Sequence, residues 1–163
     1  MSAEHPAATL RRATPDDVEA LGRLGALLVQ THHDLDPKRF IPVTPHTEDG
    51  YGNFLLSQLA EPDILVMVAE REGRVVGYAY AAVEGIDYMT LRGPAGVLHD
   101  IVVDPAHRRA GVGSLLFEET IAALRDRGAR QLVLSTAEGN VAAQRLCVRA
   151  GFRRTLVEMT RDE

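Results

Sequence analysis

The stretch that decides the fold is IVVDPAHRRAGVGS, residues 101–114. It predicts a strand, then a short turn that is ended by Gly111 and Gly113, and then an amphipathic helix. The helix is indicated by the apolar residues after Gly113, which recur three and four positions apart. The segment is therefore a strand–turn–helix unit whose helix begins at a pair of glycines.

Such a junction is suited to binding an anion. Glycines at a helix start let backbone N–H groups approach a ligand closely, and the helix dipole favours negative charge there. Arg108 and Arg109 stand directly before those amides, where guanidinium groups can clamp phosphate oxygens. The dipole alone contributes only about 0.3–1 kcal/mol. The arginines and several N–H groups therefore have to supply most of the binding.

Two common phosphate-binding motifs do not fit this segment. A Walker loop needs Gly-Lys-Ser or Gly-Lys-Thr, and the segment has no lysine. A dinucleotide-binding fingerprint needs a third glycine, where this chain has Leu116, and an acidic residue at the end of the next strand, which reads Leu-Val-Leu-Ser at residues 132–135. The pattern that remains is Arg-x-x-Gly-x-Gly.

The rest of the chain predicts a mixed α/β protein. Apolar periodicity and turn residues indicate strands over 7–12, 64–70, 75–84, 97–103, 131–136 and 152–160, and helices over 15–31, 48–59, 112–127 and 141–149. A proline-rich irregular stretch covers 32–47. We expect one domain over residues 1–163, with helices on both faces of a sheet.

Composition narrows the possible partners. The 163 residues are 45% hydrophobic and 25% charged, as in ordinary globular proteins, and the net charge of −5 argues against a general nucleic-acid binder. The longest aliphatic run, Ile64 to Ala69, is far shorter than the roughly 20 residues that span a bilayer. The single cysteine, Cys147, points to a reducing compartment. We expect a cytoplasmic protein with no nucleic-acid or membrane partner.

On these motifs the chain resembles the GNAT family of acyl-CoA-dependent N-acyltransferases. In that family, Gln/Arg-x-x-Gly-x-Gly/Ala binds the pyrophosphate and pantetheine of acetyl-CoA, and Arg108, Gly111 and Gly113 match it. The lead-in at residues 101–105 and the pattern NxxAxxLxxxxGF at residues 140–152 resemble the rest of the family signature. The resemblance implies a GNAT fold: a mixed, mostly antiparallel sheet that is splayed at the acetyl-CoA site.

The resemblance also implies acetyl-CoA as the cosubstrate, with pantetheine filling the gap between strands that end near Val103 and Ser135. Backbone groups of residues 101–103 would bond the pantetheine amides or the thioester carbonyl, where an N–H stabilises the oxyanion. Asn140 would both cap a helix and bond the cofactor. The implied cofactor-binding residues are Ile101, Val102, Val103, Arg108, Arg109, Ala110, Gly111, Val112, Gly113, Ser114, Asn140 and Ala143.

Transfer to an amine needs an acid for the departing thiolate. Family members usually carry a tyrosine four residues before the Gly-Phe pair, and this chain has Cys147 there. A thiol is more acidic than a phenol, so it can still donate a proton, although its reach is shorter. A role as a small apolar packing residue is an equally good interpretation, and water or no acid at all also stays open.

The transfer also needs a base, because the amine arrives as an ammonium. The candidates are His99 and Asp100, which strand alternation sends to opposite faces, so at most one faces the acyl carbon. In similar polyamine acetyltransferases two acids occupy this pair and the first is thought to act through water, which corresponds to His99. Alternatively, His99 is packed, Asp100 fixes the loop around Arg92, or Glu84 is the base.

The acceptor pocket is predicted to include His32, His33 and Phe40 on one side and Tyr88 on the other. A solvent-exposed loop is the alternative for Tyr88. Adjacent histidines in an irregular loop seldom converge on one ion, so we expect no metal site. The acidic net charge favours a cationic acceptor.

The sequence thus predicts an N-acetyltransferase that moves an acetyl group from acetyl-CoA to a primary amine by direct attack in a ternary complex. A small-molecule amine is preferred over a protein amino group, and the resemblance implies a homodimer. The alternative is a non-catalytic CoA- or acyl-CoA-binding sensor of the same fold. The choice of acyl chain stays open.

Overall fold

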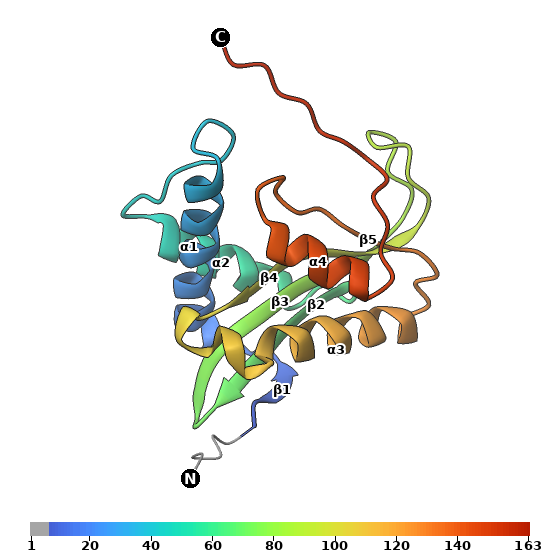
Figure 1. Ribbon diagram of the computed structural model, residues 1–163. Coiled ribbons are helices and arrows are strands. Elements are labelled where there is room, and N and C mark those ends of the chain that lie inside the picture. The colour runs from blue at the N-terminus through green and yellow to red at the C-terminus, as the bar shows by residue number, and fades with distance from the viewer. Residues whose placement is uncertain (1–6) are drawn as a thin grey trace.

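Five strands form one sheet in the computed structural model, which describes residues 7–163 (Figure 1). They are β1 (Thr9–Arg12), β2 (Ile64–Arg71), β3 (Arg74–Glu84), β4 (Ala95–Val103) and β5 (Leu132–Leu134). The strands lie side by side in the order of the chain. The first four pair in antiparallel fashion, and β5 joins β4 in parallel. The predicted mixed, mostly antiparallel sheet is confirmed.

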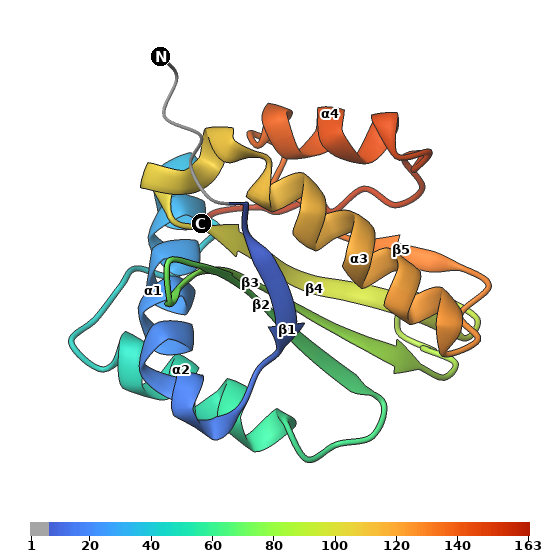
Figure 2. The same ribbon diagram turned by 90° about the horizontal axis from the view of Figure 1, so that it is seen from below.

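Helices cover both faces of this sheet (Figure 2). They are α1 (Val18–Leu35), α2 (Thr47–Gln58), α3 (Val112–Asp126) and α4 (Val141–Arg149), with short 3-10 turns at Pro15–Asp17 and Pro105–Ala110. Within β2, Val66 and Val68 pack in the core on the α1–α2 side, whereas Ala69 packs with α3. This alternation produces the two apolar layers. Among residues 7–163, no helix has the length and hydrophobicity to cross a bilayer.

An ion pair joins β1 to the start of α1. The guanidinium of Arg11 donates to the two carboxylate oxygens of Asp17 at 2.7 and 2.9 Å, and the backbone N–H of Thr14 donates to Asp17 at 2.8 Å. Asp17 is buried. The hydrogen bonds from Arg11 lower the pKa of the Asp17 carboxyl below its usual value. The first turn before α1 is therefore fastened to the edge of the sheet.

Helices α1 and α2 cross at glycines. A Cβ at Gly22 would lie 2.4 Å from the carbonyl oxygen of Glu48, and a Cβ at Gly52 would lie 2.7 Å from the carbonyl oxygen of Val18. No real side chain fits at such distances, so the two helix backbones touch directly. The glycines that weaken a helix by propensity are thus required here by the close packing.

The structure differs from the prediction mainly near the C-terminus. The strand predicted over 152–160 is wrong, because these residues form no regular structure and run away from the sheet (Figure 1). Leu156, Val157 and Met159 are exposed there. A strand exists only when a neighbouring backbone pairs with it, which an apolar pattern does not report. In addition, α1 continues to Leu35, and β5 is shorter than the predicted 131–136.

Candidate active site

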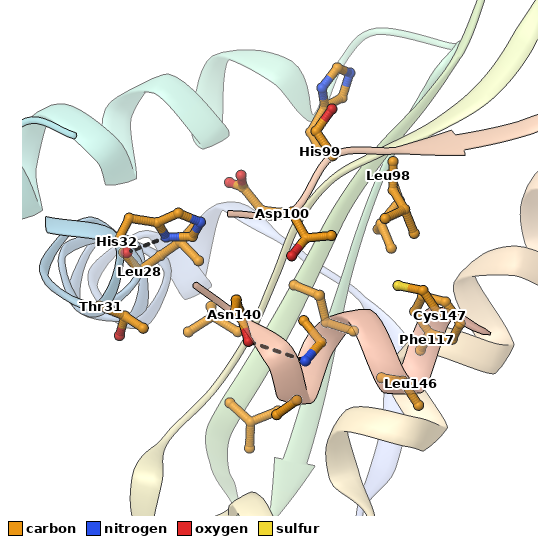
Figure 3. A pocket seen from close by; sticks show the side chains of 18 of the residues that line it. Leu28, Thr31, His32, Leu98, His99, Asp100, Phe117, Asn140, Leu146 and Cys147 are labelled. Atoms are coloured by element: carbon orange, nitrogen blue, oxygen red, sulfur yellow. Dashed lines mark hydrogen bonds between the residues drawn. The ribbon is translucent and has the colours of Figure 1, made fainter. Parts of the chain in front are cut away.

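The sheet opens between β4 and β5. These strands pair where Gly96, Val97 and Leu98 face residues 132–134. Within residues 7–163, the second half of β4 pairs with no strand on that side. A cavity of about 500 Å³ lies there, lined by β4, α1, α4 and the end of β5 (Figure 3). The predicted splay of the sheet is confirmed.

The second half of β4 forms one wall of this cavity. Ile101, Val102 and Val103 all line it, as does Arg108. The Nε–H of Arg108 donates to the carbonyl oxygen of Val103 at 3.1 Å. The guanidinium is therefore held against the end of the strand, directly before the glycine turn.

The turn itself presents open backbone. Gly111 has a φ of +76°, in the left-handed region that favours glycine, and it caps α3 without a side chain. A Cβ at Gly111 would meet no atom within 4 Å, and one at Gly113 would meet only Cγ2 of Val103 at 3.7 Å. The first N–H groups of α3 have no intrahelical acceptors. Buried Val112 anchors this turn, whereas Arg109, Ala110 and Ser114 are exposed beside it.

Helix α4 supplies the opposite wall. The side-chain oxygen of Asn140 accepts a hydrogen bond from the N–H of Ala143 at 3.1 Å, and both residues line the cavity (Figure 3). Cys147 also lines it, although the residue is only 9% exposed and belongs to the core that contains Phe117. Burial raises the pKa of the Cys147 thiol. The thiol is thus protonated near neutral pH and has both a packing contact and access to the cavity.

The two base candidates do not lie on opposite faces. A register shift pairs Tyr80 with Asp100 and Ala81 with Leu98, which leaves His99 in a bulge. Strict alternation therefore fails at this point, and both His99 and Asp100 line the cavity. Figure 3 shows the two side chains leaving the strand in different directions.

His99 is held by groups of β3. Its Nε2 lies 2.6 Å from Oε1 of Glu84, and its ring stacks on Tyr80 with 5.1 Å between centroids. The other oxygen of Glu84 accepts from the guanidinium of Arg92 at 2.9 Å. The loop around Arg92 is therefore tied to Glu84 and not to Asp100, and Glu84 positions His99.

Asp100 is bound by two tyrosines that sequence reasoning missed. The hydroxyl of Tyr51, in α2, donates to Oδ2 of Asp100 at 2.5 Å, and the hydroxyl of fully buried Tyr78, in β3, donates to it at 3.0 Å. Burial, followed by the nearby Asp100 charge, raises the pKa of both phenols. Both therefore remain O–H donors. Gly52, which follows Tyr51 in the predicted helix, was the available signal for close packing.

The predicted acceptor residues separate into two groups. His32 and Phe40 line the cavity, with 5.0 Å between their rings, and Nδ1 of His32 donates to the carbonyl oxygen of Leu28 at 2.9 Å. His33 lies outside the lining and donates to the carbonyl oxygen of Phe40 at 2.9 Å, which fixes the loop. Tyr88 is 79% exposed and also lies outside the lining. Within residues 7–163, no three His, Cys, Asp or Glu side chains group in a way that would hold a metal ion.

Comparison with known proteins identifies the class of this fold and site. The model of the acetyltransferase (GNAT) family matches residues 28–152, which include all of the residues that line the cavity. The chain belongs to this family, as the resemblance of its motifs indicated.

Individual relatives agree with this assignment. Over 96 residues the chain is 38% identical to a mycothiol acetyltransferase of Thermobispora bispora. The match covers 56% of this chain but only 31% of that protein, so the chain spans about a third of the length of this relative.

Two solved structures share the fold over nearly the whole chain. A predicted acetyltransferase from Clostridium acetobutylicum, solved with acetyl-CoA, has a TM-score of 0.72 and 15% identity, covering 94% of this chain and 96% of that one. The aminoglycoside N-acetyltransferase AAC(6')-Iy, solved with CoA, has a TM-score of 0.73 and 19% identity, covering 100% and 98%. At these identities the likeness establishes the fold.

Proposed function

We propose that this chain transfers an acetyl group from acetyl-CoA to a primary amine by direct attack in a ternary complex. The observation that carries the proposal is the cavity between the parted strands β4 and β5. It joins the strand backbone of residues 101–103, the guanidinium-bearing Arg108 and the carboxylate of Asp100 in one continuous space. The amine and the thioester can therefore meet there without a covalent enzyme intermediate.

The cofactor side fits acetyl-CoA by its backbone. The first N–H groups of α3 and the guanidinium of Arg108 would hold the diphosphate, which is the ligand that such helix starts favour. Pantetheine would lie along residues 101–103 as an added strand. An N–H of that strand, aimed at the thioester carbonyl, would stabilise the oxyanion as the amine attacks.

Proton transfer would use two side chains that line the cavity, His99 as the base and Cys147 as the acid. His99, oriented by Glu84 and partly open to solvent, would take a proton from the attacking amine through water. The departing thiolate would take a proton from Cys147, whose thiol is protonated near neutral pH, or from water. The ammonium loses one proton to His99 before the attack. The second proton, which the nitrogen loses as the C–N bond forms, passes through water and replaces the proton that Cys147 or water gives to the thiolate. The C–S bond breaks, so the products are CoA with a free thiol and an acetylated amine.

The acceptor would be a small molecule rather than a protein side chain. The α1 side of the cavity is mainly apolar, with Leu28, Phe40 and Ile41 in the lining, and Asp100 provides a carboxylate. This combination suits a cationic amine on an apolar body. The names of the mycothiol and aminoglycoside acetyltransferases also denote small-molecule compounds.

A homodimer is part of the proposal. Its support is the exposed apolar side chains of Leu156, Val157 and Met159 on an extended segment, together with the outer edge of β5, which is the last strand in the sheet order. Light scattering measures the mass in solution. A dimer that becomes monomeric when residues 155–163 are removed would support this assembly, and a monomeric full chain would contradict it.

The test of the function follows free thiol. The protein is incubated with acetyl-CoA and a panel of small amines and lysine peptides, while calorimetry measures the Kd of CoA. Thiol release above the blank with small amines supports the proposal. Binding of CoA without thiol release across the panel favours the non-catalytic sensor, and absence of binding contradicts both.

A further inference from the structure

A carboxylate that lines the cavity is held on one of its two oxygens only. The hydroxyls of Tyr51 and Tyr78 both donate to Oδ2 of Asp100, at 2.5 and 3.0 Å. Among residues 7–163, no group donates a hydrogen bond to Oδ1 of Asp100. Since Asp100 lines the cavity, this second oxygen is available to a ligand (Figure 3).

The position of Tyr51 depends on a glycine in the neighbouring helix. A Cβ at Gly25, in α1, would lie 2.2 Å from Cδ1 and 2.4 Å from Cγ of the Tyr51 ring. Glycine weakens the interior of a helix, so close contact with the ring explains its presence there. The ring lies against the backbone of α1, and from this position its hydroxyl reaches β4.

We infer that Tyr51 is a positioning residue for the acceptor: with Tyr78 it fixes Oδ2 of Asp100, so that Oδ1 receives the ammonium group of the amine. The inference rests on the proposed function, because it requires an amine in this cavity. The amine binds as an ion pair with Asp100, gives one proton through water to His99, and then attacks the thioester as a neutral nucleophile.

Titratable side chains from α1, α2, β3 and β4 itself face Asp100. They are His32 of α1, Tyr51 of α2, Tyr78 and Tyr80 of β3, and His99 of β4. None of them is a lysine or arginine, and Arg108, the only arginine among the described lining residues, donates to the backbone of Val103. Among the described residues, the two phenol hydroxyls are therefore the groups that donate hydrogen bonds to this carboxyl group.

The test is Tyr51→Phe, which removes the hydroxyl and keeps the ring. A carboxylate that loses a hydrogen-bond donor is protonated more easily, so the acidic limb of the kcat/KM profile for the amine should move up by about 0.5–1 pH unit. The KM for the amine should rise by up to about tenfold near that limb, while the Kd of acetyl-CoA stays unchanged. The matched control is Tyr88→Phe, which removes a phenol hydroxyl from a side chain that is 79% exposed and lies outside the cavity lining, and its profile should coincide with that of the unaltered protein.

A second readout does not depend on turnover. Carbon-13 NMR of the Asp100 carboxyl in the ligand-free protein should show the same upward movement of the titration midpoint in Tyr51→Phe and none in Tyr88→Phe. If no amine is acetylated but this midpoint moves, the proposed function fails while the hydrogen-bonded carboxylate is supported. Coincident titrations of Tyr51→Phe and the unaltered protein would overturn the inference.

The role of Gly25 is tested by a double-mutant cycle. Gly25→Ala displaces the ring and should reproduce the shift of Tyr51→Phe, and the double variant should shift no further, because the hydroxyl is already lost. Additive shifts would contradict the coupling. Where Gly25→Ala does not fold, Tyr78→Phe removes the other donor and should move the midpoint in the same direction; no movement would count against the arrangement.

Discussion

The cofactor half and the acceptor half of the cavity are built in different ways. The cofactor half comes from one continuous stretch, residues 101–147, and its expected ligands are mainly backbone groups around Gly111 and Gly113. The acceptor half joins Tyr51, Tyr78 and Asp100, from three separate elements, through side-chain hydrogen bonds. A short motif can therefore specify the first half, whereas the second half exists only once α1 and α2 have packed.

The largest expected effect is a loss of CoA affinity from changes made in the cofactor half alone. Arg108→Ala combined with Gly113→Asp removes a guanidinium and places a carboxylate against the diphosphate. Because each charged hydrogen bond contributes about 1.5–3 kcal/mol, CoA affinity should fall by at least about 100-fold. Calorimetry measures the Kd. Circular dichroism should show an intact fold, since a Cβ at Gly113 meets only Val103 at 3.7 Å. An unchanged Kd would contradict the site.

The next effect concerns the support of the acceptor half. Asp17→Asn should lower the free energy of unfolding near neutral pH by about 2 kcal/mol, because it breaks the charged hydrogen bonds that the buried Asp17 accepts from the half-exposed Arg11 at the start of α1. The pKa of Asp17 is lowered below its usual 3.8, so its contribution is present above that pH and is lost as the pH falls through the lower folded value. Urea denaturation at several pH values measures this.

The control for that experiment is Asp16→Asn, at an exposed neighbour of Asp17. Its unfolding free energy should stay within about 0.5 kcal/mol of the unaltered protein. A constant difference between Asp17→Asn and the unaltered protein down to pH 2 would contradict the electrostatic origin of the stabilisation.

A methyl group at Gly113 tests how closely the diphosphate approaches the backbone of the cofactor half. Gly113→Ala should stabilise the fold by up to about 1 kcal/mol, since the space for a Cβ is open and the residue is helical. It should nevertheless weaken CoA binding by about tenfold (~1.4 kcal/mol), because the methyl group keeps the diphosphate from the backbone. Thermal melting and calorimetry test both. The matched control is Gly50→Ala in α2, where the space for a Cβ is also open; it should stabilise the fold without changing the affinity for CoA. Equal Kd values for CoA in the two variants would exclude a close approach of the diphosphate to the backbone at Gly113.

The smallest effect is expected at Cys147, which is interpreted either as a packing residue or as the acid that protonates the thiolate. With Cys147→Ser, kcat near neutral pH should change by less than about tenfold (~1.4 kcal/mol), since water can replace the acid. The alkaline limb of the rate profile should change if the thiol donates the proton, because burial raises the pKa of Cys147 and that titration disappears in the variant. A pH–rate series measures this, and an identical alkaline limb would leave Cys147 as a packing residue beside Phe117.

The sequence predicted most of the helices and strands, but it did not predict the hydrogen bonds that join Tyr51 and Tyr78 to Asp100. Helix α4 has the predicted bounds, and the glycine junction at residues 111–113 starts α3 as expected. His32 and Phe40 reach the cavity, whereas Tyr88 does not. The expected alternation of side chains between the two faces fails at the His99 bulge, because a single extra residue in a strand changes the face that later side chains occupy.

The sequence by itself determined the periodic elements, the helix start that can receive an anion, and the family. These features depend on local backbone preferences and on residues close together in the chain. Tertiary structure alone decided that Tyr51 reaches Asp100, that Gly25 makes room for its ring, and that residues 152–163 leave the sheet. Such contacts depend on how distant segments approach one another, which local patterns do not encode.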